Sequence, residues 1–172
     1  LTRWFAIQSD TDVATRLFIA RNTNETGLSF MLWQRTADAL LLDAIARNPS
    51  ANPGILNTVA IHPLTNTAAL LAIAQNPISN TEDLQRVLAR ENIDVPILVA
   101  IGNHKNASAE LLLNIVRHKL SDMAVLTAVI HNPNITAAVL AAVATHQNAT
   151  VELLLHVIKH ELCDEATLTA VV

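Results

Sequence analysis

A leucine recurs every fourteen residues along the chain, and apolar residues follow it at fixed offsets. After Leu42 come Ile45 and Ala46, and after Leu112 come Ile115 and Val116. Offsets of zero, three and four make one face of an α-helix, whereas a strand would alternate with a period of two. The pattern predicts one short helix in each unit. The leucines are Leu28, Leu42, Leu56, Leu70, Leu84, Leu98, Leu112, Leu126, Leu140, Leu154 and Leu168.

A residue that can cap a helix lies four positions before each of these leucines. The oxygen of a short polar side chain accepts hydrogen bonds from the unpaired N–H groups of a first helical turn. Extending the register backwards adds Asp10 as a further cap. The predicted caps are Asn24, Asp38, Asn52, Asn66, Asn80, Asp94, Ser108, Asp122, Thr136, Thr150 and Asp164.

Proline marks the helix ends at one position of the same register. The pairs are Asn48-Pro49, His62-Pro63, Asn76-Pro77 and Asn132-Pro133. Proline disfavours helical geometry in the residue before it, so each pair indicates a stop. We expect helices of about nine to ten residues and loops of about four, and helices this short must stack on one another to be stable.

A longer repeat is superimposed on this register. The sequence of residues 104–129 is similar to that of residues 146–171, forty-two positions later. Leu71, Leu113 and Leu155 share this spacing, and the helices that carry them are nearly all apolar. A helix that is apolar all round is a buried one. We therefore predict a right-handed all-α solenoid with a three-helix superrepeat, in which this helix is sandwiched in the core. Alanines two residues after the key leucine, such as Ala44 and Ala128, should let helices approach closely.

The whole chain, residues 1–172, is predicted to be one helical repeat array. Residues 1–35 keep the register in degenerate form, and residues 36–172 are regular. The last residues stop inside a repeat without a polar cap, so we expect a fragment of a longer chain. The degenerate part holds every aromatic residue: Trp4, Phe5, Phe18, Phe30 and Trp33.

Composition supports an all-α, soluble protein. Apolar residues make up 51% of the chain but aromatic residues only 3%, so helix formers dominate over the residues typical of strands. A net charge of −4 argues against a general nucleic-acid surface, which needs basic residues. The longest apolar run, residues 137–144, is too short to span a membrane. A single cysteine, Cys163, and no signal-peptide pattern favour the cytoplasm or another reducing compartment.

Two sequence segments in the first half of the chain resemble a known repeat. DAIARNPSANPGILNTVAIHPLTN and LLAIAQNPISNTEDL are similar to the leucine-rich repeat variant motif, over residues 41–84 and again over 131–140. More broadly, the chain resembles HEAT and armadillo solenoids. The resemblance implies a curved solenoid that binds proteins. Some leucine-rich repeat variant proteins hold an iron–sulfur cluster through cysteines, but with one cysteine we expect no cofactor here.

Three groups of residues are candidate partner-binding sites. The first is a histidine column at forty-two-residue spacing, which would stack into a ladder for an extended peptide or an anion. The alternative is that these histidines hydrogen-bond the helix ends, as asparagines at the same position would. The column is His62, His104 and His146.

The second candidate is a basic ridge of Arg117 and Lys159, with Arg86 and Lys119 as further candidate members, which would hold an acidic peptide or phosphates. Its alternative is an ordinary solvated face. The third is the aromatic group Trp4, Phe5 and Trp33, which is either a binding hot spot or internal packing.

A metal site is conceivable at His156, His160, Cys163 and Asp164. However, Asp164 is in the cap register and His160 is at the helix-end position, so structural roles explain both. We therefore predict no metal site.

The sequence contains no recognisable nucleophile–base pair, glycine-rich phosphate loop or HExxH motif. It therefore predicts a non-enzymatic scaffold that binds a protein or peptide on one face of the solenoid. The alternatives are a structural spacer in a larger protein and a nucleic-acid-binding HEAT-like module.

Overall fold

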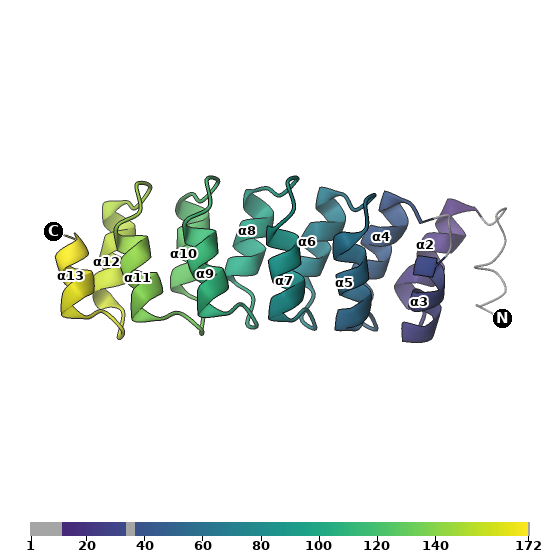
Figure 1. The fold of residues 1–172 in the computed structure, drawn as a ribbon, viewed down its shortest axis with the longest axis horizontal. Coiled ribbons are helices and arrows are strands. Elements are labelled where there is room, and N and C mark those ends of the chain that lie inside the picture. Colours follow the sequence, from purple (N-terminus) through teal and green to yellow (C-terminus); the bar gives the residue numbers. More distant parts are fainter. Residues whose placement is uncertain (1–11, 34–36, 172) are drawn as a thin grey trace. The chain divides into compact units, whose positions relative to one another are not determined.

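The computed structural model describes residues 12–33 and 37–171, in which the chain forms twelve α-helices and no strand (Figure 1). The all-helical solenoid class is thus confirmed. Contacts divide the chain into two compact units, residues 1–93 and 94–172, and each is described by itself. Trp4, Phe5 and Asp10 lie outside the described residues.

Each unit contains six of these helices. The first unit has α2 (Val13–Asn22), α3 (Glu25–Trp33), α4 (Ala39–Ala46), α5 (Pro53–Ile61), α6 (Thr67–Gln75) and α7 (Thr81–Leu88). The second has α8 (Val95–Gly102), α9 (Ala109–Val116), α10 (Met123–Ile130), α11 (Ala137–Ala144), α12 (Val151–Lys159) and α13 (Glu165–Val171).

The helix starts follow the predicted caps with one exception. Asp38 accepts the N–H of Leu41 at 2.8 Å, and the later caps make the equivalent bond three residues on. In α2, however, the cap is Asp12 rather than Asp10. Thr15 donates both its N–H, at 2.9 Å, and its hydroxyl, at 2.6 Å, to the Asp12 carboxylate, which fixes the start two residues later.

The helices alternate between two layers in each unit. In the first unit α2, α4 and α6 pack in one layer and α3, α5 and α7 in the other. In the second unit α8, α10 and α12 form one layer and α9, α11 and α13 the other (Figure 1). We call these the even and odd layers. One turn therefore takes two helices, or twenty-eight residues, the separation of the side-chain bonds that join successive loops.

The two-helix turn corrects the predicted three-helix superrepeat. The fourteen-residue segments have equal length, so each fits either layer. Advancing by three segments, or forty-two residues, therefore moves a position from one layer to the other. The copies α9 and α12 accordingly lie in opposite layers. Sequence similarity at a spacing of forty-two residues therefore shows that two segments have similar local sequence. It does not show that they are neighbours in space.

The apolar helices α6, α9 and α12 are likewise not sandwiched. Leu71 and Leu113 are half-buried, and Leu155 is 49% exposed. Because two layers leave every helix one outer face, the extra leucine lies on that face.

The core is built from the leucine column and the apolar residues three and four positions after it. Every column leucine from Leu28 to Leu140 is fully buried, whereas Leu168 is 44% exposed. Leu112, for example, lies in α9, which packs on α11, α10 and α8. Among the described helices, α13 makes its substantial contacts with α11 and α12. Burial of this position therefore depends on neighbours along the layer.

Small residues allow close packing in the even layer, as predicted. Ala44, Ala72 and Ala128 are buried. A Cβ atom on Gly102 of α8 would lie 3.1 Å from the Cβ of Ala128 in α10, so glycine permits this approach.

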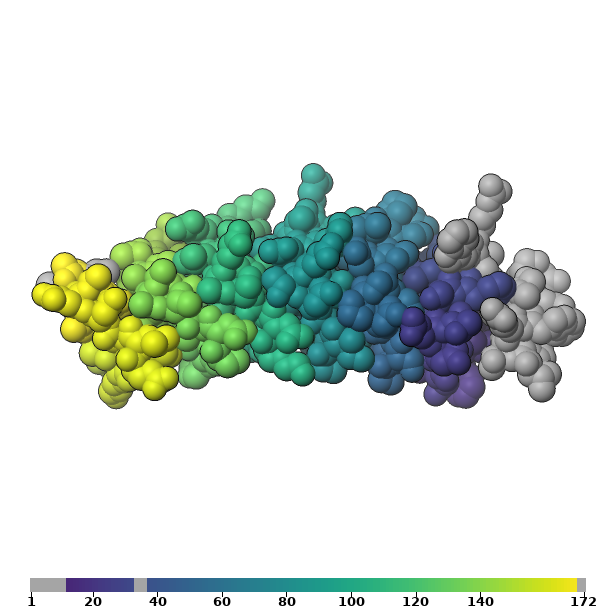
Figure 2. Space-filling model, turned by 60° about the horizontal axis from the view of Figure 1, so that its bottom comes forward, coloured from purple at the N-terminus to yellow at the C-terminus, as the bar shows by residue number. Residues whose placement is uncertain are grey.

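Within each unit, successive segments lie next to one another in sequence order (Figure 2). Every substantial helix–helix contact joins helices one or two places apart in the chain. None of the described helices has the length and apolar character to cross a membrane.

Candidate binding grooves at the helix C-termini

One polar position at the helix end is shared by asparagine and histidine. The Oδ1 of Asn76 accepts the N–H of Ile78 at 3.1 Å, and the Nδ1 of His62 accepts the N–H of Leu64 at 3.2 Å. Asn48 and Asn132, and His104, His118, His146 and His160, make the same bond to the residue two positions on. Because Nδ1 is the acceptor, each neutral imidazole carries its proton on Nε2. The position is thus primarily a turn-forming one.

Three asparagines at this position also join successive loops. The Nδ2 of Asn76 donates to the Ala46 carbonyl at 2.8 Å, and that of Asn132 donates to Gly102 at 2.6 Å and His104 at 3.0 Å. Asn48 bonds the carbonyls of Ala20 and Thr23 in the same way. We call these bonds asparagine bridges. They supply a hydrogen-bond donor to the carbonyls of Ala20, Ala46 and Gly102 at helix C-termini.

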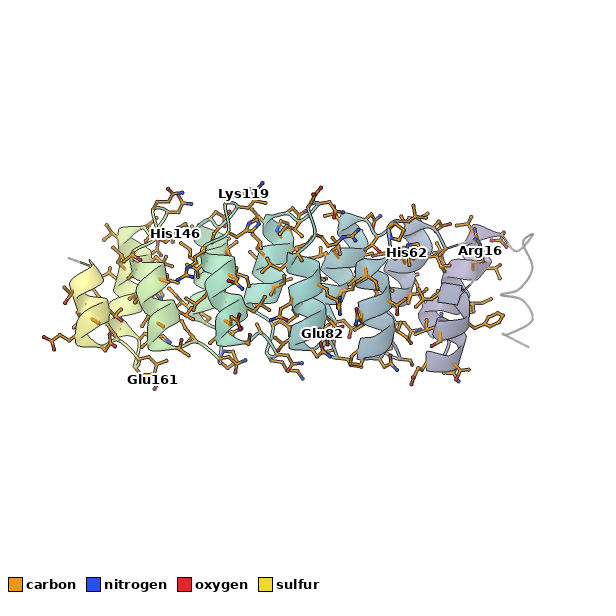
Figure 3. The ribbon with its side chains drawn as sticks, viewed as in Figure 1. Arg16, His62, Glu82, Lys119, His146 and Glu161 are labelled. Atoms are coloured by element: carbon orange, nitrogen blue, oxygen red, sulfur yellow. The ribbon has the colours of Figure 1, made fainter. Side chains whose placement is uncertain are left out.

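The predicted histidine column does not form in the second unit. His104 is buried in the loop between α8 and α9, which runs from the even to the odd layer. His146 lies in the α11–α12 loop, which runs from odd to even. Figure 3 places His146 and Lys119 at one edge of this unit and Glu161, from another even-to-odd loop, at the opposite edge. Three helix reversals separate the two histidines. His62 lies in an odd-to-even loop of the first unit, where its carbonyl accepts from Arg90 at 3.4 Å.

The predicted basic ridge is also divided between the layers. Arg117 caps the C-terminus of α9 in the odd layer, whereas Lys159 ends α12 in the even layer. Both are exposed. Of the aromatic candidates, Trp4 is outside the described residues. Trp33 is the last residue of α3, and its side chain is outside the described part.

The structural roles assigned to Asp164 and His160 are present. Asp164 accepts the hydroxyl and the N–H of Thr167, at 2.7 and 2.8 Å, and these bonds lower the pKa of its carboxyl. His160 accepts the N–H of Leu162 at 3.2 Å. Across residues 12–33 and 37–171, no three histidine, cysteine or acidic side chains are grouped so that they could hold a metal ion.

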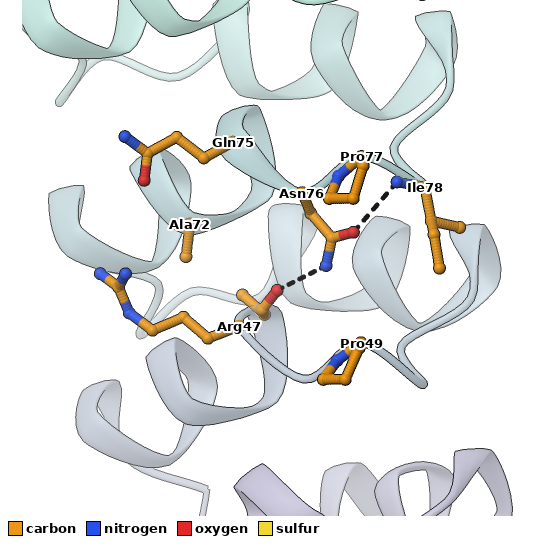
Figure 4. Close-up of a pocket in the computed structure, with 8 residues that line it drawn as sticks. Arg47, Pro49, Ala72, Gln75, Asn76, Pro77 and Ile78 are labelled. Carbon is orange, nitrogen blue, oxygen red and sulfur yellow. Dashed lines mark hydrogen bonds between the residues drawn. The ribbon is translucent and has the colours of Figure 1, made fainter.

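A groove of 320 Å³ lies between the C-terminal ends of α4 and α6 in the first unit. Figure 4 shows the Asn76 bridge between the two helices, with Arg47 and Gln75 on one side of it. The Nε of Arg47 is paired with the Asp43 carboxylate at 2.9 Å, which neutralises its charge locally. The lining is Ala46, Arg47, Pro49, Ala72, Gln75, Asn76, Pro77 and Ile78.

The second unit has an equivalent groove of 420 Å³ between α10 and α12. Ile130, His131 and Pro133 stand eighty-four residues, or three turns, after Ala46, Arg47 and Pro49. Five lining residues of the first groove, from Ala72 to Ile78, belong to α6 and the loop after it. Each of them also has a counterpart eighty-four residues later in the second groove. These counterparts are His156, Lys159, His160, Glu161 and Leu162, and Ile135 completes the lining.

Imidazole groups and one lysine give the α10/α12 groove its chemistry. The Nδ1 of His131 lies 2.8 Å from the Thr127 carbonyl, which can only accept, so Nδ1 carries a proton. The rings of His131 and His156 meet edge to face, with centroids 6.0 Å apart and planes at 65°. Among the described residues, Lys159 makes no ion pair. A third cavity, of 660 Å³ between α3 and α5, is lined by uncharged residues.

No family model, curated protein or solved structure matches this chain.

Sequence reasoning singled out Lys159 but missed His131, which lies beside it across the groove. The missed signal is the twenty-eight-residue spacing between these two positions. At forty-two-residue spacing Lys159 was paired with Arg117, which belongs to the other layer. His156 was considered only as a metal ligand, whereas the structure brings it against His131.

Proposed function

We propose that this protein is a non-enzymatic scaffold that binds a protein or peptide through the even-layer grooves, and that it is an α-solenoid of the leucine-rich repeat variant, HEAT and armadillo kind. One observation carries the proposal. Two grooves whose lining positions are eighty-four residues apart in the sequence keep the same framework but present different side chains. Separating a constant framework from variable lining positions is how repeat arrays build specific binding surfaces.

The framework consists of the leucine column, the caps and the turn-forming position. Its members are buried or hydrogen-bonded, so changing them costs stability. The lining positions Arg47, Gln75, His131 and Lys159 are all exposed, and the bonds that Arg47 and His131 make stay within one turn of their own helix. Arginine and glutamine in one groove become histidine and lysine in the other. This pattern fits recognition of a partner by side chains that the fold does not constrain. The single thiol, Cys163, suits a reducing compartment.

The proposal is tested by capturing partners with wild type and two matched double variants. The even-face variant carries His131→Ala and Lys159→Ala. The control carries Arg117→Ala and Lys119→Ala, which remove two exposed cations from the odd-layer end and the opposite loop edge. Circular dichroism checks that both variants keep wild-type helicity.

A partner that binds wild type and the control but not the even-face variant supports the proposal. A partner lost only from the control places the binding surface on the odd side and contradicts the even-layer assignment. Absence of any specific partner contradicts the scaffold function and favours a structural spacer.

A further inference from the structure

The two equivalent grooves differ in their polar and charged side chains. In the α4/α6 groove the only cation in the lining, Arg47, is held by Asp43 four residues earlier. In the α10/α12 groove the position of Asp43 is taken by Thr127, which uses its carbonyl to hold His131. The α10/α12 groove, whose lining holds Lys159 and three histidines, therefore lacks the acidic residue that pairs with Arg47 in the first groove.

The facing helix adds to this difference. Lys159 stands where the first groove has Gln75, and His156 stands where it has Ala72. His160 replaces the bridging Asn76, and its Nδ1 is occupied by the N–H of Leu162, so its Nε2–H points away from that turn as a donor. One acidic side chain, Glu161, lies in the lining, at the outer edge of the unit (Figure 3).

An apolar surface adjoins these donors. Ile130 is 4% exposed and Ile135 9%, whereas Leu162 is 38% exposed. A volume of 420 Å³ is within the range of sites that take part of a ligand, about 300–1,000 Å³. The groove thus combines a hydrogen-bond-donating side with an aliphatic side.

We infer that the α10/α12 groove recognises a peptide segment with an acidic side chain next to an aliphatic one. The inference rests on the scaffold function proposed above. The carboxylate lies against Lys159 and the Nε2–H of His160, next to the His131–His156 pair, and the aliphatic side chain covers Ile135 and Leu162. A carboxylate fits better than a phosphate. The lining has no arginine to make the paired bonds that phosphates favour, and Glu161 repels a dianion more than a monoanion.

The test uses fluorescein-labelled pentapeptide pools with a fixed central residue flanked by leucine or isoleucine. The central residue is glutamate in the first pool, glutamine in the second and phosphoserine in the third. Binding to the full chain is followed by fluorescence anisotropy at low and high salt. Lys159→Gln is the test variant. Lys119→Gln is the control, because it makes the same charge change at the opposite edge of the unit.

The inference expects wild type to bind the glutamate pool more tightly than the glutamine pool, with weaker binding at high salt. Lys159→Gln should weaken glutamate binding about five- to tenfold, as loss of a charge-assisted hydrogen bond does. Lys119→Gln should bind as wild type does. In proton NMR spectra, the imidazole C–H resonances of His131 and His156 should shift when the peptide binds. These resonances are assigned by their absence from the spectra of the His131→Asn and His156→Asn variants.

Three results overturn the inference. Preference for the phosphoserine pool makes the site a phosphate site. Equal binding of glutamate and glutamine pools removes the role of charge. No binding of any pool shows that the groove does not take such a peptide. If the even-face variant still loses a captured partner in these cases, the scaffold function stands and only the partner's chemistry is wrong.

Discussion

A histidine at the turn-forming position is both a structural and a titratable group. Its neutral Nδ1 accepts the N–H of the residue two positions on, as an asparagine Oδ1 does, but an imidazolium has no acceptor. His118 makes this bond to Leu120 at 3.2 Å. Burial lowers the pKa of His118 below 6.5, and the positive charge of Lys119 lowers it further. The native turn therefore favours the neutral ring.

The lowered pKa predicts a pH-dependent stability. Below pH 6.5 the unfolded chain binds a proton at His118 more readily than the native chain does. The stabilising contribution is therefore complete above pH 6.5 and is lost as pH falls through the native pKa. His118→Asn keeps the turn acceptor and removes the titration. The variant's melting temperature should fall less than that of wild type between about pH 7.5 and about pH 5. Identical slopes for the two proteins would contradict this account.

The asparagine bridge at Asn132 should contribute more to stability than the turn bond alone. Asn132→Ala removes two bonds to the carbonyls of Gly102 and His104 and one from Asn134. It should cost about 2–4 kcal/mol, because three hydrogen bonds are lost and the Gly102 carbonyl is left unsatisfied, whereas the His104 carbonyl keeps its bond from Ala107. Asn132→His keeps only the turn bond and should fall between wild type and the alanine variant in urea unfolding. His146→Ala, which removes only a turn bond, is the control and should cost about 1 kcal/mol or less.

At the scale of the helix, each element is a short segment stabilised by its neighbours. The helices have seven to ten residues, too few to persist alone in water. Caps define where each begins, but the energy comes from burying the leucine column between layers. The column gives an internal comparison, because its members have the same local sequence role and different burial.

Leu112→Ala and Leu168→Ala should therefore differ in cost. Leu112 is fully buried, and its truncation should cost about 2–5 kcal/mol. Leu168 is 44% exposed, so the same change should cost about 1 kcal/mol or less. Chemical denaturation of both variants measures the difference. Equal costs would mean that the leucine register, rather than neighbour contact, sets the contribution.

At the scale of the whole molecule, the contacts are local in sequence. Helices contact those one or two places away, so a disturbance has few routes to distant helices. Arrays of this kind behave as chains of nearest-neighbour interactions rather than as one indivisible core.

Because the contacts are local, a substitution in the core should destabilise only the helices near it. Leu56→Ala opens the core around α5 in the first unit. Hydrogen exchange read by mass spectrometry should show faster exchange in α3 to α7 and unchanged exchange in α10 to α12. Leu126→Ala should give the reverse pattern. Faster exchange throughout the chain in both variants would indicate a single cooperative unit instead.

The sequence by itself determined the local structure. The fourteen-residue spacing of leucines and the caps at Asp38 and Asp122 predicted the helix starts, and the prolines predicted the ends of α4, α5, α6 and α10. These features act within one helical turn, so the chain carries them without reference to its neighbours. The exchange of asparagine with histidine at the helix end also pointed correctly to a structural role, through the bonds of Asn76 and His62.

Only the tertiary structure decided which helical segments lie side by side. The strongest sequence likeness, at forty-two residues, joins opposite layers, and it misdirected the pairing of Lys159 towards Arg117. Neighbours are set by the alternation of layers every fourteen residues, a property of how short antiparallel helices bury their leucines on two sides. The pairing of His131 with His156, and with it the candidate groove, follows from that alternation.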